Sequence, residues 1–142
     1  MATCHDIAAY ILCEMGEMTT MKLQKLVYYA QAWSLVWDEK PLFNERIEAW
    51  ANGPVVPELY LVHRGKFTVG KWPQGNPDIL DGTQRETVRA VLDFYGKKDS
   101  QWLSNLTHRE DPWVSAREDL APGERGNTEI TLAAMAEYYS SL

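Results

Sequence analysis

Hydrophobic residues recur every three or four positions along most of this sequence, which is the spacing of one face of an α-helix. The helices that this spacing predicts cover residues 4–15, 20–37, 55–64, 83–96, 100–106 and 129–140. Residues 46–51 alternate between apolar and polar, as a half-buried strand does, and residues 68–72 form a second candidate strand. The pattern therefore predicts a mainly α, compact single domain over residues 1–142, with about six helices around a central apolar helix and a minor, short two-stranded β element.

Short sequence signals mark the starts of two of these helices. Thr3 with Asp6, and Thr83 with Glu86, have the spacing of a capping box. In that motif, two side chains satisfy N–H groups that have no partner within the helix. We therefore expect helices to begin next to Thr3 and Thr83.

An Asn-Gly-Pro sequence at 52–54 interrupts the first predicted strand. Gly53 tolerates positive φ, and Pro54 fits a first helical turn, where N–H groups lack helical partners. We therefore expect a structural turn here, followed directly by the helix over 55–64.

The predicted helix over 20–37 is apolar on nearly all sides, so it should lie at the centre of the fold. Its narrow polar strip contains Gln24 and Gln31, which are seven residues apart. Two interpretations of these glutamines remain open. Their amides either satisfy buried backbone groups or face a groove.

The composition is that of an acidic globular protein. Of its 142 residues, 45% are hydrophobic, and the formal net charge is −6 at pH 7. Because negative charge repels a phosphate backbone, direct binding to nucleic acid is not expected. Cys4 and Cys13 are too few for a disulfide framework, and no apolar stretch is long enough to span a bilayer. These features favour a cytoplasmic protein without membrane contact.

The densest polar cluster lies at 107–113 and contains His108, Glu110 and Asp111. A histidine oriented by a carboxylate can act as a general base, so a small enzyme built on these three residues is one interpretation. The other is a helix-to-loop corner, in which polar side chains bind the backbone and Trp113 anchors the loop in the core. Since no nucleophile is identifiable, no catalytic residue is expected.

No sequence pattern indicates a metal, a nucleotide or another cofactor. His5, His63 and His108 lie far apart in the chain, and neither common glycine-rich phosphate-binding motif is present. We therefore expect neither a cofactor nor a metal site.

Four blocks of residues become informative when they are considered together. They are MKLQKLVYYAQAW at 21–33, EAWANGPVVPELY at 48–60, the polar and aromatic residues within 103–117, and the aromatic helix around 130–139. In order and spacing, from about residue 5 to 140, these blocks resemble the Panacea antitoxin family, also called SocA-like or GepA-like.

The resemblance implies a mostly helical domain that serves as the antitoxin of a type II toxin–antitoxin module, often carried by phages and other mobile elements. Such a domain neutralises a cognate protein toxin by direct binding. The family is paired with unrelated toxins, among them toxic small alarmone synthetases and other translation- or membrane-targeting toxins. Some members carry an additional N-terminal DNA-binding domain, but no separate DNA-binding domain is expected here. Both a homo-oligomer and a hetero-oligomer with the toxin stay open.

The expected toxin-binding residues come from the first and third blocks. They are Gln24, Lys25, Tyr28, Gln31, His108, Asp111 and Trp113. Amides edged by aromatic rings would supply hydrogen bonds and anchors to toxins of different shape. The alternative is that the aromatic residues belong to the core and that the glutamines tie loops to the helix. Two other functions also stay open: the small enzyme, acting on a toxin product, and a phage-encoded adaptor that binds a host protein.

Overall fold

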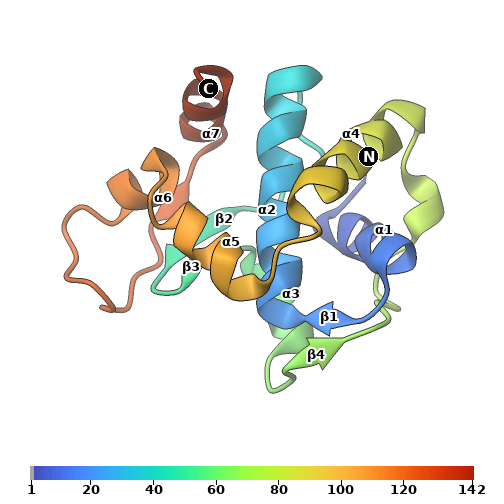
Figure 1. The fold of residues 1–142 in the computed structure, drawn as a ribbon, viewed down its shortest axis with the longest axis horizontal. Helices are drawn as coiled ribbons and strands as arrows, with labels where there is room; N and C mark the ends of the chain where they lie inside the picture. The colour runs from blue at the N-terminus through green and yellow to red at the C-terminus, as the bar shows by residue number, and fades with distance from the viewer. Residues whose placement is uncertain (1) are drawn as a thin grey trace.

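A long helix, α2 (Thr20–Trp37), lies at the centre of the structure, which is a computed structural model that describes residues 2–142 (Figure 1). The other long helices that contact it are α1 (Cys4–Met15), α4 (Gly82–Tyr95), α5 (Ser100–Thr107) and α7 (Leu132–Ser140). Every residue of α2 from 23 to 32 is buried. The prediction of a mainly α fold around a central apolar helix is therefore confirmed.

Three shorter helices complete the helical part. They are α3 (Pro57–His63), α6 (Asp111–Ala116) and the 3-10 helix η1 (Pro77–Ile79). Within residues 2–142 there are seven α-helices, one more than the number predicted. The additional helix is α6, which lies where the sequence suggested a corner. Pro112 stands in its first turn, where a missing N–H costs no hydrogen bond.

The strands form two small antiparallel sheets. In one, β1 (Met18–Thr19) pairs with β4 (Thr68–Val69); in the other, β2 (Ile47–Trp50) lies between β3 (Gly53–Val55) and β5 (Glu129–Ile130). Strands occur at both predicted places, but the two belong to different sheets. The segment of β3 is predicted from sequence as a turn and a helix start. Instead, Pro54 pairs with Ala49 in the hairpin, and α3 begins only at Pro57.

Side chains cap the helices largely as the sequence indicated. The capping box of Thr3 and Asp6 is present at the start of α1. At α4, however, the box is formed by Asp81 and Gln84, two positions before the predicted pair. The same spacing occurs twice in this short stretch, and aspartate caps a helix as well as threonine does.

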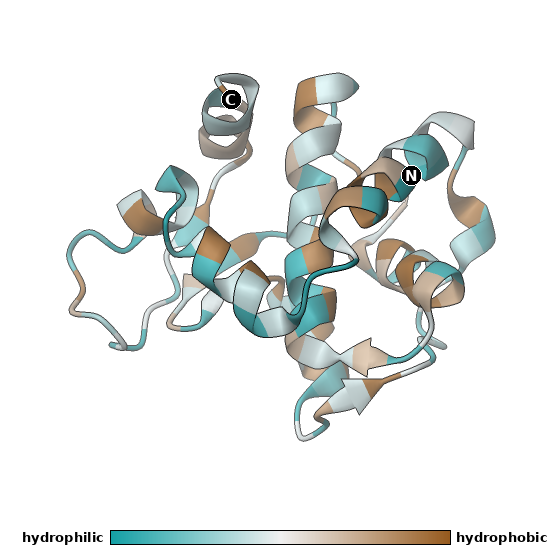
Figure 2. Cartoon of the chain, viewed as in Figure 1, coloured by the Kyte–Doolittle hydropathy of each residue, from teal (hydrophilic) through white to brown (hydrophobic). Residues whose placement is uncertain are grey.

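The connection between α6 and β5 covers residues 117–128 and is mostly hydrophilic in colour at the left of Figure 2. Its first residue, Arg117, is buried and donates hydrogen bonds to the carbonyls of Ala49 and Glu124. These bonds fold the loop back over β2, so the loop lies beside the β2–β3 hairpin.

Candidate functional site

Gln24 is fully buried and holds the backbone between β3 and α3. Its Oε1 accepts a hydrogen bond from the Val56 N–H at 2.8 Å, and its Nε2 donates to the Val56 carbonyl at 3.3 Å. The same Nε2 lies 2.9 Å from Nε2 of His63. Because Val56 fixes the orientation of the amide, His63 Nε2 must accept from it, and the imidazole is neutral with its proton on Nδ1. Burial also lowers the pKa of His63.

Gln31 has the same kind of role two turns further along α2. Its Oε1 accepts hydrogen bonds from the N–H groups of Leu42 at 2.7 Å and Phe43 at 3.4 Å, and its Nε2 donates to the Phe43 carbonyl at 2.8 Å. Both glutamines therefore satisfy buried backbone groups, the first of the two roles that the sequence left open.

Lys25 is fully buried beneath the β2–β3 turn, and its Nζ has no hydrogen-bond partner within residues 2–142. Gly53 covers it closely, since a Cβ at that position would lie 2.5 Å from Lys25 Cε and 3.0 Å from Nζ. Burial lowers the pKa of Lys25 to about 8. An enclosed ammonium without a partner is costly, so Lys25 destabilises the fold at neutral pH.

His108 and Trp113 stack on each other at the corner between α5 and α6. Their ring centroids are 4.1 Å apart, and the indole N–H of Trp113 donates to the Trp50 carbonyl of β2 at 2.8 Å. Burial lowers the pKa of His108; the backbone of Asn52 opposes this effect, and the charge of Lys25 adds to it. The third sequence block therefore packs against the hairpin formed by the second block.

Glu110 joins three parts of the fold. Its buried carboxylate accepts hydrogen bonds from the hydroxyls of Tyr29 at 2.6 Å and Tyr139 at 2.8 Å, and the Tyr28 hydroxyl lies 3.0 Å from that of Tyr139. Burial raises the pKa of Glu110, while the two tyrosine hydrogen bonds act in the opposite direction. This carboxylate links α2 and α7 to the start of α6.

The three residues of the enzyme interpretation do not form one site. Asp111 is exposed and accepts a hydrogen bond from Ser115 at 2.8 Å, whereas Glu110 is occupied by the two tyrosines. Neither carboxylate is bonded to His108 within residues 2–142, so no carboxylate orients the imidazole as a general base.

The seven residues expected to contact a toxin are therefore divided. Lys25, His108 and Trp113 meet around the β2–β3 hairpin, as does Gln24 through Val56. Of the rest, Gln31 and Tyr28 are enclosed elsewhere on α2, and Asp111 lies on the surface beside the corner.

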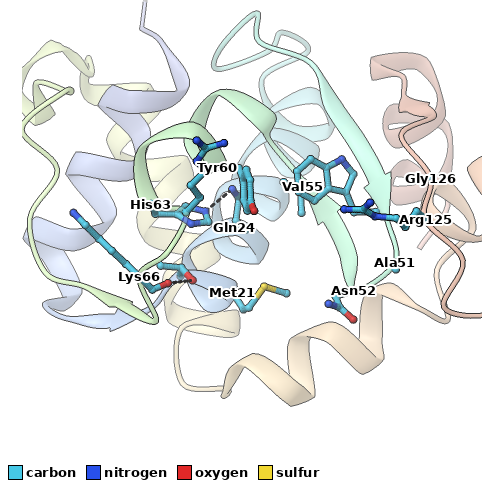
Figure 3. A pocket seen from close by; sticks show the side chains of 13 residues that line it. Met21, Gln24, Ala51, Asn52, Val55, Tyr60, His63, Lys66, Arg125 and Gly126 are labelled. Carbon is cyan, nitrogen blue, oxygen red and sulfur yellow. Dashed lines mark hydrogen bonds between the residues drawn. The ribbon is translucent and has the colours of Figure 1, made fainter.

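A surface pocket of about 360 Å³ opens beside the same hairpin (Figure 3). Trp50 and Tyr60 contribute aromatic rings whose centroids are 4.9 Å apart, and the bonded pair of Gln24 and His63 forms part of the lining. Arg125 reaches the pocket from the loop between α6 and β5 (Figure 3). Apart from Gln24, none of these residues is predicted from the sequence as part of a site, because they come from β2, α3 and a loop and form no local motif.

The described part of the chain contains neither a metal-binding cluster nor a membrane-spanning helix. Among residues 2–142, no three histidine, cysteine or acidic side chains lie close enough to hold a metal ion. Within the same residues, the helices are too short or too polar to cross a membrane.

The fold and its site define a small α-helical domain in which a tight hairpin covers a buried lysine and borders a basic, aromatic-lined pocket. The family described as Antitoxin SocA-like, Panacea domain, matches residues 23–114. Since this match covers more than half of the chain, the chain belongs to that family.

Comparison with individual proteins gives a similar result. Antitoxin SocA of Caulobacter vibrioides (strain NA1000 / CB15N) is 29% identical over 111 residues, which cover 68% of this chain and 58% of that protein. The chain thus spans less than two thirds of this relative's length. No solved structure matches the chain. The resemblance drawn from the four sequence blocks is confirmed.

Proposed function

We propose that this protein is the antitoxin of a type II toxin–antitoxin module and that it neutralises its cognate toxin by direct protein–protein binding. The observation that carries the proposal is the family match over residues 23–114, which includes both the helix that holds Lys25 and the corner that holds His108. The name of the Caulobacter relative, an antitoxin, supports the same role.

The toxin-binding surface that we propose is the exposed side of the α5–α6 corner together with the adjoining hairpin. His108, Asp111 and Trp113 lie there, and Asp111 is exposed. Gln24, Lys25, Tyr28 and Gln31 are buried, so their part is indirect. Gln24 fixes the backbone at Val56 beside the hairpin, and Lys25 packs beneath Gly53.

Titration of toxin with antitoxin tests the proposed mechanism. The chain is purified with the protein encoded in the adjacent reading frame, and toxin activity is measured against increasing antitoxin. Neutralisation is expected to be complete at equimolar amounts, with a complex that stays intact in size-exclusion chromatography. Rescue at far lower amounts, without a complex, would contradict direct binding and favour an enzyme.

A pair of charge reversals tests the proposed surface. Asp111→Arg is expected to weaken the complex by about 30-fold or more, since it reverses a charge and adds a larger side chain within the proposed interface. Glu86→Arg, on the exposed side of α4, is the matched control, because it changes the net charge equally. Both affinities are measured by calorimetry. If only the α4 variant weakened binding, the interface would lie on that helix.

A further inference from the structure

The pocket beside the β2–β3 hairpin has a positive lining in a protein whose net charge is −6. Arg64, Lys66 and Arg125 belong to the lining, whereas the described lining contains no aspartate or glutamate. No side-chain ion pair within residues 2–142 involves any of these three cations. Their charges therefore remain available to an anionic group from outside the chain.

The three cations differ in where their charged ends lie. Figure 3 shows the Lys66 side chain pointing away from the pocket, and its carbonyl accepts a hydrogen bond from Thr20. Arg125 instead extends from its loop toward the hairpin (Figure 3). Arg64 is exposed, follows the last turn of α3 and belongs to the same lining. The lining therefore contains two arginines, and a guanidinium binds a carboxylate with two parallel hydrogen bonds.

The remainder of the pocket is suited to an apolar side chain. Met21, Trp50 and Tyr60 line it. The indole N–H of Trp50 already donates to Glu48 at 2.8 Å, so the ring offers apolar surface to a partner. Glu48 itself is paired with Arg46 at 3.0 Å, which offsets the charge of this nearby carboxylate.

We propose that this pocket receives an acidic segment of the toxin, with a carboxylate bound by Arg64 and Arg125 and a neighbouring apolar side chain packed against Met21, Trp50 and Tyr60. The inference rests on the proposed antitoxin function and deepens it by naming the chemistry of the contact. Although the chain has a net negative charge, the pocket is positively charged, so it can attract an acidic segment of the partner. Arginine and aromatic residues are also the types that dominate binding energy in interfaces.

The test compares two double variants that change the net charge equally. In the pocket variant, Arg64→Glu and Arg125→Glu are combined; in the control, Lys40→Glu and Lys97→Glu alter two exposed lysines elsewhere. Toxin affinity is measured by calorimetry, and circular dichroism confirms that both variants are folded. The pocket variant is expected to lose about 30-fold or more in affinity and the control less than about 3-fold. Arg64→Gln with Arg125→Gln, which adds no negative charge at the end of α3, is expected to lose about 10-fold.

Other results would overturn either the pocket assignment or the proposed function, and the two cases can be distinguished. If the wild-type chain binds the toxin and all the variants bind it equally well, the pocket assignment is overturned while the antitoxin function stands. If the wild-type chain forms no complex at all, the proposed function fails first. A third arm titrates the chain with inorganic pyrophosphate. Pyrophosphate binding that is lost in the pocket variant, with toxin affinity unchanged, would replace the acidic segment with a phosphate ligand.

Discussion

At the scale of single residues, Lys25 combines a charge with complete burial, which is unfavourable for folding. Its ammonium is buried without a partner among residues 2–142, and the glycine above it leaves no room for a larger residue. A methionine would fill nearly the same volume without a charge. Replacing the lysine with methionine therefore measures how much the buried charge costs the fold.

We predict that Lys25→Met stabilises the folded protein by about 1–4 kcal/mol at pH 7, because it removes a buried, unpaired charge. The pKa of Lys25 is about 8 in the fold, below its value in the unfolded chain. As the pH rises from about 8 towards 10.5, the folded state loses its proton first, so wild-type stability should increase over this window.

Urea denaturation at several pH values measures both effects. Lys22→Met serves as the control, since Lys22 is only half-buried and its Nζ donates to the Gly96 carbonyl at 2.7 Å. Removing that lysine should not stabilise the protein. An unchanged or lower stability in Lys25→Met would show that the ammonium has a favourable partner in solution.

At the scale of elements, the sequence predicts α2 well because burial on all sides leaves a clear apolar pattern. It places the start of α4 at Thr83 rather than Asp81 because two overlapping capping spacings compete there, and local sequence does not distinguish them. The strand β3 has three residues and contains Pro54, so no alternation could reveal it. Its position depends on pairing with β2 and on contact with α2.

The hairpin is the element whose geometry can be tested most directly. Gly53 has φ of +126° and lies against Lys25, whereas Gly65 has φ of +85° and open space where a Cβ would lie. Alanine at either position strains the backbone by about 1–3 kcal/mol. Gly53→Ala should destabilise the protein by at least about 1 kcal/mol more than Gly65→Ala, since its Cβ also overpacks the buried lysine.

Thermal unfolding of the two alanine variants gives this difference. If both variants lost the same stability, the turn at Gly53 would be able to move away from Lys25 at little energetic cost. Toxin affinity of Gly53→Ala, measured below the unfolding transition, then reports whether the hairpin shape matters for binding.

At the scale of the whole molecule, the sequence does not predict the pocket, because its lining residues are distant from one another in the chain. Arg64 and Arg125 are far apart in the chain, and both line one pocket because a hydrophilic loop folds back over β2. The net charge of −6 by itself favours a basic partner. The structure shows that local charge can have the opposite sign.

The buried titratable groups also set how the whole fold responds to pH. Burial lowers the pKa of His63 and His108, so the unfolded chain binds protons first as the pH falls. Their contribution to stability is complete above about pH 6.5 and is lost progressively below it. Glu110 acts in the opposite sense: its pKa is raised, so its contribution is largest at low pH and is lost as the pH rises through its folded pKa.

We therefore expect stability to decline as the pH is lowered from about 7.5 to about 5.5, with a smaller decline in His63→Gln, which keeps a group able to accept from Gln24. His5→Gln is a suitable control, because it changes a histidine on α1 outside this site. The free energy of unfolding is obtained from urea titrations at each pH. Identical pH profiles for His63→Gln and the wild-type chain would contradict a neutral, buried His63.

Arg117 holds its loop by peptide carbonyls, at Ala49 and at Glu124, rather than by side chains. The exposed residues Glu118, Asp119, Ala121 and Pro122 can therefore be exchanged while the bonds of Arg117 stay in place. That freedom makes the loop a site for engineering. A fluorescent dye or a grafted peptide at its tip would stand next to the Arg125 pocket and would turn the chain into a sensor for whatever enters it.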